Sequence, residues 1–548
     1  MRIKLVSLED GTTSCGFRKI AAFTSRINPD TESYYITTKR YASLGNILFG
    51  SHGIGKMGDD QIDEIAQGLA DADMVGFSSM TGYANITRRV ISRVREIRPD
   101  MLMVWGGIHP IIQPEDAITA EVDAICTGEG EFAFEQFLQL AKEGRDYSKV
   151  ENFWVKRGND VIQNGFLPLM STAEMESLPF PQYGEGEKIY REGKGFEPMV
   201  LSDYVVHGGV DYSTLWSIGC PFRCSYCGNT KFIENDPNYT KIRHTSARYI
   251  VDEVKSVRAR FPHVSQVSFH DDSFMAIPYR QLEEFAELWH DELDIPFTVY
   301  GVIPNYVRRD KFEILTWAGM NRVRMGIQSG SQALLDFYKR PTPPEKIMHA
   351  AEVISEFAPK YHVAPSYDMI MDNPIETRQD VIDTLELAYA MPRPFTFIIF
   401  SLKVIPNTGL AEEMRKRGVN LEAIDSSYLE IPPRMANLLL YMLATWRPPR
   451  WLFDRLLKRV EASATPQPLY PRTAFVFRAL FFGKKVYNHL KMMDFSTMPG
   501  WISYYAYRTG LIGFWRRHII KRMPRPEPPK HASSPNVIPV IATDATNP

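Results

Sequence analysis

The sequence predicts an α/β protein built from two successive sheet-and-helix units, followed by a helical C-terminal region. Three observations lead to this fold class. Strand-like and helical patterns alternate over the first 145 residues, alternate again from residue 214 to about residue 404, and give way beyond Pro406 to helix-like, aromatic and basic sequence. Such alternation is typical of parallel sheets whose strands are joined by covering helices.

Length and composition fit a large globular protein. The chain has 548 residues, 44% of them hydrophobic, and a formal net charge of −2. These values argue against an intrinsically disordered chain and a globally basic nucleic-acid binder. Five cysteines are too few and too unevenly placed for a disulfide framework, so we expect a reducing, cytoplasmic location. Neither a secretion signal nor a run of 18 apolar residues is visible, so any membrane contact is expected to be peripheral.

The first unit, residues 1–150, is expected to form a doubly wound parallel sheet. Strands are predicted at residues 2–8, 34–38, 74–78, 101–105 and 122–126, and helices at residues 17–27, 59–72, 86–97 and 131–142. Small and polar residues follow three strands, at residues 78–82, 106–110 and 127–131. Because ligands of open α/β sheets bind beyond the carboxyl ends of the strands, we expect a ligand cleft there. The loops lack the G-x-G-x-x-G fingerprint, which argues against a nicotinamide cofactor.

The second unit, residues 208–405, is expected to form a sheet that is closed or partly closed into a barrel. After a first strand ending near Thr214, strands are predicted at residues 266–269, 297–301, 322–327, 366–370 and 397–400. Helices are predicted at residues 247–261, 280–291, 309–318, 344–357 and 378–390. Residues 151–207, with proline and glycine near their middle, are interpreted as an irregular linker.

The C-terminal region, residues 406–523, is predicted to be helical and to precede a disordered, proline-rich tail at residues 524–548. Between Arg434 and Lys530 the chain has 18 Lys and Arg against 4 Asp and Glu. Paired basic residues alternate there with aromatic runs at residues 481–482 and 501–505, a pattern typical of a helix at an anionic membrane interface. Stacking on single-stranded nucleic acid and a helical cap with a solvated basic face are the alternatives. We expect no nucleic-acid partner.

The most informative segment holds Cys220, Cys224 and Cys227, with the spacing C-x3-C-x2-C. Thiolates this close can converge on one soft metal centre. A structural zinc site normally takes four protein ligands, and no second cysteine pair is present. An iron–sulfur cluster with three thiolates leaves one iron open to a substrate or cofactor. We favour this interpretation over structural zinc or buried thiols.

The segment resembles the C-x3-C-x-aromatic-C motif of the radical S-adenosylmethionine (SAM) enzymes, with Tyr226 at the aromatic position. The resemblance implies a [4Fe–4S] cluster held by the three cysteines and a SAM molecule bound to the fourth iron. It also implies reductive cleavage of SAM to a 5′-deoxyadenosyl radical, a partial (β/α)6 barrel, and an electron donor such as flavodoxin or ferredoxin.

Three further segments resemble the same family. Residues 268–274 are similar to F-x-D-D-x-F. Residues 325–331 are similar to G-I-E-S-G-S, with Gln328 in place of the usual Glu. The amide oxygen of Gln328 can still accept a hydrogen bond, but it carries no charge. Residues 367–377 resemble D-x-I-x-G-x-P-x-E-T and depart from it at Asp372 and Asn373. The alternative for the two aspartates is a solvated turn. The resemblance implies these SAM-binding residues: Tyr226, Gly228, Asn229, Asp271, Asp272, Gln328 and Ser329.

The N-terminal unit resembles the Rossmann-like cobalamin-binding domain of cobalamin-dependent radical SAM enzymes, through G-G-x-H-P at residues 106–110 and G-E-G-E at residues 128–131. The loop at residues 9–16 has no histidine, and a partial D-x-H-x-x-G match at residues 50–55 lacks the aspartate. We therefore expect no histidine ligand to cobalt from this domain. His109 is expected either to line the cleft or to pack within its loop. The implied cobalamin-binding residues are Ser78, Ser79, Thr81, Gly106, Gly107, His109, Gly128, Glu129, Gly130 and Glu131.

Together these features predict a cobalamin-dependent radical SAM enzyme that transfers a methyl group to an unactivated carbon of a hydrophobic, lipid- or isoprenoid-like substrate. The chemistry requires no protein nucleophile. An oxidative cyclase or ring-forming enzyme without methyl transfer is one alternative, and a non-catalytic cobalamin or redox sensor is another. A methylthiotransferase would need further N-terminal cysteines, and only Cys15 and Cys126 are present there.

Overall fold

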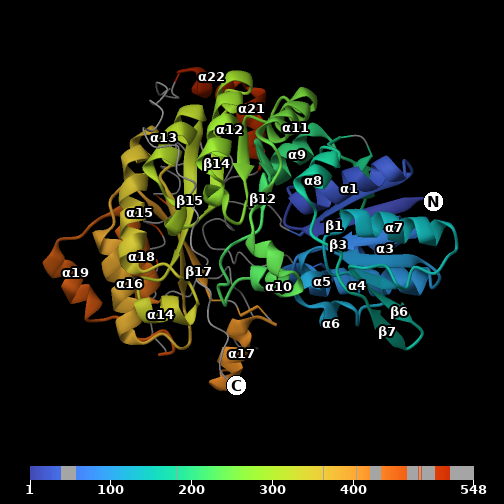
Figure 1. Cartoon of the computed structure of the whole chain (residues 1–548), viewed down its shortest axis with the longest axis horizontal. Coiled ribbons are helices and arrows are strands. Elements are labelled where there is room, and N and C mark those ends of the chain that lie inside the picture. Colours follow the sequence, from blue (N-terminus) through green and yellow to red (C-terminus); the bar gives the residue numbers. More distant parts are fainter. Residues whose placement is uncertain are drawn as a thin grey trace.

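A computed structural model of the chain shows two α/β domains in contact, with further helices at the C-terminus (Figure 1). The structure describes residues 1–38, 57–181, 183–184, 186–361, 363–402, 404–405, 407–419, 434–465 and 500–518, with the single residues 475, 479 and 483. Within these ranges no helix has the length and apolar character needed to cross a membrane. The partial cobalamin motif at 50–55, the basic pairs at 484–485 and 521–522, the aromatic pair at 481–482 and the expected tail lie outside the described residues.

The N-terminal sheet has nine strands in the order β7-β6-β5-β4-β3-β1-β2-β8-β9. Helices cover both faces of its parallel centre, with α3 and α4 in one core and α1 and α7 in another. This arrangement confirms the predicted doubly wound sheet, and its 2-1-3-4-5 order favours a ligand beside the carboxyl ends of β1 and β3. The central strands are β1 (Ile3–Glu9), β2 (Thr31–Thr37), β3 (Met74–Ser78), β4 (Leu102–Gly106) and β5 (Ala124–Cys126), and the helices are α1 (Cys15–Ile27), α3 (Asp59–Leu69), α4 (Ala84–Ile97) and α7 (Glu131–Lys142).

Residues 151–207, which the sequence led us to expect as an irregular linker, extend this sheet at both edges. The added strands are β6 (Phe153–Arg157) and β7 (Asp160–Gln163) beside β5, and β8 (Glu187–Arg191) and β9 (Gly195–Pro198) beside β2. The same segment forms the short helices α8 (Thr172–Ser177) and α9 (Leu201–Gly208). Strands β7, β8 and β9 are short and mostly exposed or partly exposed, so no apolar run marks them in the sequence. Strand β6 begins with the apolar run Phe153-Trp154-Val155, a strand signal inside the segment that was expected to be a linker.

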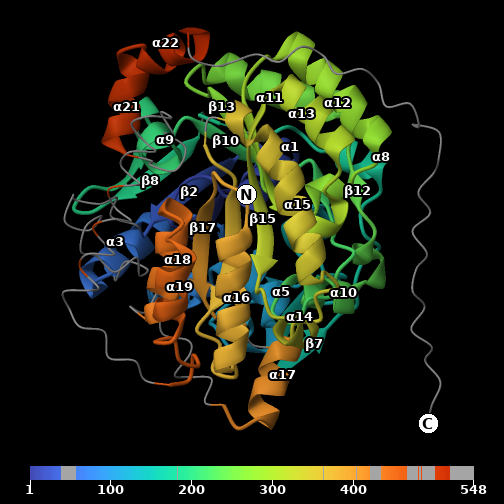
Figure 2. The same cartoon turned by 90° about the vertical axis from the view of Figure 1, so that its left-hand side faces the viewer.

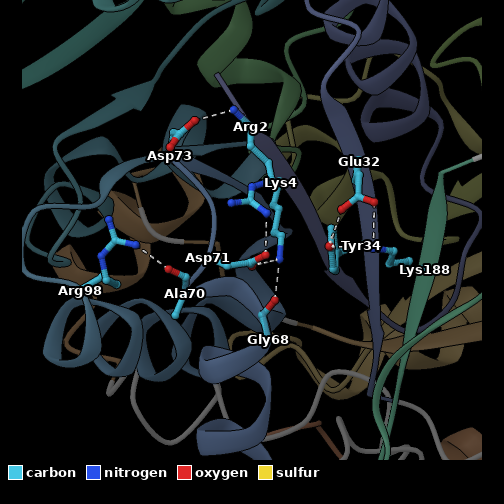
Figure 3. A network of polar contacts seen from close by, with 10 residues as sticks. All are labelled: Arg2, Lys4, Glu32, Tyr34, Gly68, Ala70, Asp71, Asp73, Arg98 and Lys188. Atoms are coloured by element: carbon cyan, nitrogen blue, oxygen red, sulfur yellow. Dashed lines mark hydrogen bonds and ion pairs between the residues drawn. The ribbon is translucent and has the colours of Figure 1, made fainter.

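Polar contacts fasten the sheet near the start of its central strands (Figure 3). Lys4 on β1 is buried, and its Nζ donates a hydrogen bond to the carbonyl oxygen of Gly68 over 2.7 Å and pairs with Asp71 beyond the end of α3. On β2, Glu32 forms an ion pair of 2.8 Å with Lys188 on β8. These contacts lie at the amino ends of the strands, away from the predicted ligand loops, and their role is structural.

The second sheet has six parallel strands in the order β10-β13-β14-β15-β16-β17. In Figures 1 and 2 the connecting helices lie on one side of these strands and the N-terminal domain lies on the other. Because β10 and β17 do not pair within the described residues, this is the predicted, partly closed (β/α)6 arrangement. The strands are β10 (Asp211–Thr214), β13 (Gln266–Phe269), β14 (Phe297–Val302), β15 (Met320–Gln328), β16 (Ser366–Met371) and β17 (Thr396–Ser401), and the helices are α11 (Ala247–Arg260), α12 (Tyr279–Glu292), α13 (Arg309–Ala318), α15 (Pro344–Phe357) and α16 (Arg378–Ala390).

The C-terminal region is helical, as predicted. Its described helices are α17 (Gly409–Lys416), α18 (Met435–Thr445), α19 (Arg450–Leu457), α21 (Trp501–Arg508) and α22 (Leu511–His518). Helix α18 packs against α16 and β17, and Leu439 and Leu443 join the barrel core. Helix α21 packs on α9, where Ala506 contacts the apolar cluster around Val205.

A buried ion pair ties strand β8 to helix α1. The Nη1 atom of Arg18 lies 2.5 Å from Oε1 of Glu187, and both side chains are almost fully buried. Tyr35 Oη donates a hydrogen bond of 2.9 Å to the same oxygen, and Tyr204 Oη donates to Oε2. Arg18 Nε also donates to the carbonyl oxygen of Thr12 over 2.9 Å. Removing one partner of such a pair leaves an uncompensated buried charge.

We expect Glu187→Gln to lower the free energy of unfolding by about 3 kcal/mol, because the Arg18 guanidinium loses its buried counterion. Glu292→Gln is the control, since Glu292 pairs with Arg248 at the surface and exposed pairs contribute little to stability. Urea denaturation followed by circular dichroism measures both variants. Equal destabilisation by the two substitutions would contradict the role of the buried pair.

Candidate active site

The three cysteines lie on one loop between β11 (Ser217–Ile218) and α10 (Asn229–Asn235). All three are free thiols, and burial raises the pKa of Cys220 and raises that of Cys227 to about 12. Gly219, with φ of 115°, lets the loop pass Lys241, because a Cβ there would lie 2.5 Å from the Lys241 carbonyl oxygen. Thiols buried in this way become ligands when a bound metal stabilises the thiolate.

The donor set fits an iron–sulfur cluster better than a single metal ion. In the part of the chain that the structure describes, no three His, Cys, Asp or Glu side chains gather around a single-ion site. A cluster instead takes each thiolate on a different iron. Arg340 is buried beside the thiols, with Nη1 3.9 Å from Cys224 Sγ and 3.1 Å from Tyr226 Oη. Its Nε has no hydrogen-bond partner among the described residues, so a donor remains for a ligand.

Gln328 and Arg340 lie together over β15 because residue 326 is a glycine. Gln328 has φ of 75°, and a Cβ at Gly326 would lie 2.6 Å from Gln328 Nε2 and 3.4 Å from Arg340 Nη2. Arg340 also donates a hydrogen bond to the Gly326 carbonyl oxygen. A guanidinium and an amide beside the cysteine loop suit the carboxylate and amino groups of an amino-acid ligand, and SAM is such a ligand. Arg340 belongs to no motif that the sequence reveals.

The two aspartates of the 268–274 segment are not in a solvated turn. Asp271 is 1% exposed and accepts hydrogen bonds from the backbone N–H groups of Trp216 and Ser217, at 3.2 and 2.5 Å. Burial raises the pKa of Asp271 to about 6. Asp272 accepts a hydrogen bond of 3.0 Å from Tyr239 Oη. Asp271 therefore holds the strand that leads into the cysteine loop, and its side chain is directed at protein backbone.

The remaining residues predicted to bind SAM differ in accessibility. Ser329 is buried, with Oγ 3.1 Å from Oγ1 of Thr384, so it braces β15 against α16. Asn229 begins α10 and hydrogen-bonds the Asp272 carboxylate, which lowers the pKa of that carboxyl against the larger raising effect of burial. Tyr226 packs edge-on against Tyr338. Gln328, Arg340 and the cysteine loop therefore present polar groups at one place, where Ser273 Oγ also lies 3.5 Å from Cys220 Sγ.

The small-residue loops of the first domain meet at one edge of its sheet. Ser78 at the end of β3 lies in register with Gly106 at the end of β4. Gly107 has φ of 90°, and a Cβ there would lie 2.9 Å from the backbone nitrogen of Ser79. Thr81 Oγ1 is buried without a hydrogen-bond partner among the described residues. A glycine-lined edge with an unpaired hydroxyl fits a cofactor lying across the strand ends, as cobalamin would.

His109 packs within its own loop. Its ring lies 4.9 Å from the Trp105 ring, and Nε2 lies 3.0 Å from Oδ2 of Asp116. Burial lowers the pKa of His109, which is 1% exposed. Two positions were expected for His109, lining the cleft or packing within its loop, and in the structure it packs within its loop.

The loop after β5 supports α7 and the domain contact. Gly128 packs tightly on Asn152, since a Cβ there would lie 2.7 Å from Asn152 Cγ. Gly130 precedes α7, and Glu131 is the first residue of that helix, where burial raises the pKa of its carboxyl. The carboxylate of Glu129 points instead to the second domain.

The cysteine loop and the small-residue loops lie against each other across the domain contact. Glu129 Oε1 forms an ion pair of 2.7 Å with Arg243 on β12 (Arg243–His244). Asn235 at the end of α10 donates a hydrogen bond of 3.3 Å to the Thr127 carbonyl oxygen. Helix α10 also contacts α5 (Ile108–Ile112), as Figure 1 shows. A Cβ at Gly228 would lie 2.9 Å from the Ile112 side chain, so this approach requires a residue without a side chain.

Comparisons with known proteins identify both domains. Residues 215–388 match the radical SAM superfamily, and residues 53–138 match the B12 binding domain. The chain belongs to the cobalamin-dependent radical SAM family. Its cofactors are accordingly a [4Fe–4S] cluster, SAM and cobalamin, as the sequence predicts.

Individual relatives are distant. An uncharacterized methyltransferase from Pyrococcus horikoshii is 22% identical over 58% of this chain and 64% of its own length. The anaerobic magnesium-protoporphyrin IX monomethyl ester cyclase of Synechocystis is 26% identical over 49% of this chain and 50% of its own length. The chain thus spans only half to two thirds of these relatives. The radical SAM methyltransferase TsrM from Kitasatospora setae shares the fold, with a TM-score of 0.58, 17% identity and 76% of each chain covered.

Replacing Cys220, Cys224 and Cys227 together by Ala should abolish cluster binding. After anaerobic reconstitution we expect about four irons per wild-type chain and almost none in the triple variant, because the cluster has no other thiol nearby. Metal analysis and the visible absorption spectrum measure this. Cys15→Ala, which removes a thiol outside the loop, is the control and should keep its iron. Bound zinc in place of iron, or iron retained by the triple variant, would contradict the assignment.

Proposed function

We propose that the protein cleaves SAM reductively and transfers a methyl group to an unactivated carbon of a hydrophobic substrate. One observation carries the proposal: the cysteine loop with α10 abuts the loops after β4 and β5 of the B12-binding domain. A substrate held at this contact would be within reach of both cofactors. The same contact would keep water away from reactive species.

When bound, the cluster with SAM supplies radical chemistry and cobalamin supplies the methyl group. The residues of the chain bind and orient these partners. The three cysteines would hold the cluster, while Arg340 and Gln328 would hold the polar end of SAM, with Tyr226, Gly228 and Asn229 beside them. The glycine-lined edge at Gly106 and Gly107 would receive cobalamin. Radical SAM enzymes need an electron donor, and flavodoxin or ferredoxin is our proposal for this role.

Ring formation without methyl transfer is the second candidate. Relatives named as cyclases and relatives named as methyltransferases match this chain at similar identity, 26% for the Synechocystis cyclase and 25% for the cobalamin-dependent radical SAM methyltransferase TokK of Streptomyces tokunonensis. A cobalamin or redox sensor has less support, because the three thiols and the buried Arg340 lie together in the second domain, beside its contact with the first.

The products of SAM distinguish these candidates without knowledge of the substrate. With reductant, cluster and SAM, we expect wild-type protein to release 5′-deoxyadenosine, and with added cobalamin to release S-adenosylhomocysteine as well, because methyl transfer leaves that product. Liquid chromatography with mass spectrometry measures both. Formation of 5′-deoxyadenosine alone would support the ring-forming candidate, and absence of both products would contradict an enzymatic function.

A hydrophobic substrate and peripheral membrane contact are proposed from the C-terminal helices. The large side chains of Trp501, Ile502, Tyr505 and Phe514 are more than half exposed on α21 and α22. The surrounding sequence has the excess of Lys and Arg noted above. This combination favours an anionic membrane surface as the place where an apolar substrate is delivered, and it is consistent with the expected cytoplasmic location.

Sedimentation with lipid vesicles tests the membrane proposal. We expect wild-type protein to pellet with vesicles that contain phosphatidylglycerol but not with pure phosphatidylcholine vesicles. Trp501→Ser combined with Tyr505→Ser should reduce the bound fraction several-fold, because interfacial binding scales with buried apolar area. Val161→Ser, at an exposed apolar position on β7, is the control. Absence of binding to anionic vesicles would leave the helical-cap alternative.

A further inference from the structure

We propose that Arg324 binds a carboxylate group of the substrate on the inner face of the second sheet. The proposal rests on the proposed function and deepens it by naming the substrate class, an apolar molecule that carries a carboxylate. It stands on the position of Arg324, on the way its guanidinium is held, and on the two donors that this arrangement leaves unused.

The side chain of Arg324 lies on the sheet face that the helices do not cover. Successive residues of a strand point to opposite faces, and Val323, Met325 and Ile327 of β15 lie in the core beneath the helices. Arg324 and Gln328 therefore lie on the other face. In Figures 1 and 2 this face is turned away from α13, α15 and α16, toward the N-terminal domain. Arg324 precedes Gln328 by four residues, about 13 Å deeper along the strand.

The guanidinium of Arg324 is held in one position, but only its Nε donates a hydrogen bond to another described residue. Its Nε donates to both carboxylate oxygens of Asp368 on β16, at 2.7 and 2.9 Å. The rings of Tyr300 and Phe400 flank it, with centroids 5.7 and 5.5 Å from Cζ. Nη1 and Nη2 have no hydrogen-bond partner among the described residues, and 28% of the side chain is exposed. Two parallel donors thus face the inner side of the barrel.

These surroundings suit a carboxylate on an apolar molecule. A guanidinium held in one orientation binds a planar carboxylate through two parallel hydrogen bonds. Asp368 repels a doubly charged phosphate more strongly than a singly charged carboxylate. His270 stacks on Tyr300, with ring centroids 4.6 Å apart, and adds a third ring on this side of the guanidinium. The aromatic rings beside the guanidinium would contact the apolar part of the molecule.

SAM also carries a carboxylate, and it is the other source of an anion at this place. The residues proposed to hold it, Gln328 and Arg340, lie at the carboxyl end of β15 beside the cysteine loop. Arg324 lies deeper in the barrel, so its anion is assigned to the substrate. The experiment below measures the two carboxylates separately.

The test uses the full-length, reconstituted protein with 4-(trifluoromethyl)benzoate as probe and 4-(trifluoromethyl)benzamide as its neutral counterpart, observed by fluorine NMR. Wild-type protein should bind the benzoate about tenfold more tightly than the benzamide. Arg324→Gln combined with Asp368→Asn removes both charges, so neither is left buried and unpaired, and should abolish this preference. Arg309→Gln on the outer helix α13, where Arg309 is 60% exposed, is the control and should keep it.

Equal binding of the two probes by wild-type protein, binding of neither, or a preference that persists in the folded double variant would overturn the proposal. Equilibrium dialysis with SAM gives the second measurement, and we expect the Kd of SAM to be unchanged in the double variant. A parallel rise in that Kd would assign the anion site to SAM itself and overturn the assignment to substrate. Absence of 5′-deoxyadenosine from wild-type protein would instead contradict the proposed function, and the probe measurement does not depend on that activity.

Discussion

The position of the cysteine loop depends on one buried carboxylate, which fixes the segment from which the loop starts. Asp271 accepts the backbone N–H groups of Trp216 and Ser217, and a buried carboxylate is tolerated only when such hydrogen bonds satisfy it. The neighbouring strand must make room for this anchor. At Gly301, with φ of 65°, a Cβ would lie 1.9 Å from the Asp271 carbonyl oxygen. Glycine is therefore required at that point of β14, and the loop leaves the barrel in one direction, toward the first domain.

That direction brings two binding surfaces together. The chain after the cysteines meets the loops of the B12-binding domain through Asn235, Gly228 and the Glu129–Arg243 ion pair. The segment between the domains strengthens this arrangement, because its strands complete the first sheet and Glu187 is buried against Arg18 of α1. A reaction that uses two large cofactors needs both to reach one substrate. The geometry of the protein meets that need through the domain contact.

The sequence predicts those parts of the molecule whose signals are local. The helices at 309–318, 344–357, 378–390 and 131–142 begin and end where the apolar periodicity places them, and the cysteine spacing indicates the cluster site directly. Strands β7, β8 and β9 escape prediction because short, partly exposed strands lack an apolar pattern, whereas β6 carries an apolar run at residues 153–155 that the linker interpretation overlooks. Arg340 escapes it because its partner Tyr226 is 114 residues away. The Asp271 side chain faces backbone where a ligand contact was expected, a distinction that only tertiary structure can make.

Electron paramagnetic resonance tests most directly whether one domain contact holds the two cofactors face to face. The protein is loaded with cobalamin in the cob(II)alamin state, and its spectrum is recorded with the [4Fe–4S] cluster oxidised and then reduced. Close approach predicts that the reduced cluster broadens or splits the cobalt signal by spin–spin coupling, and that this effect is lost when Cys220, Cys224 and Cys227 are replaced by Ala. A cobalt spectrum that does not change on reduction of the cluster would show that the cofactors are held apart and would contradict the arrangement described here.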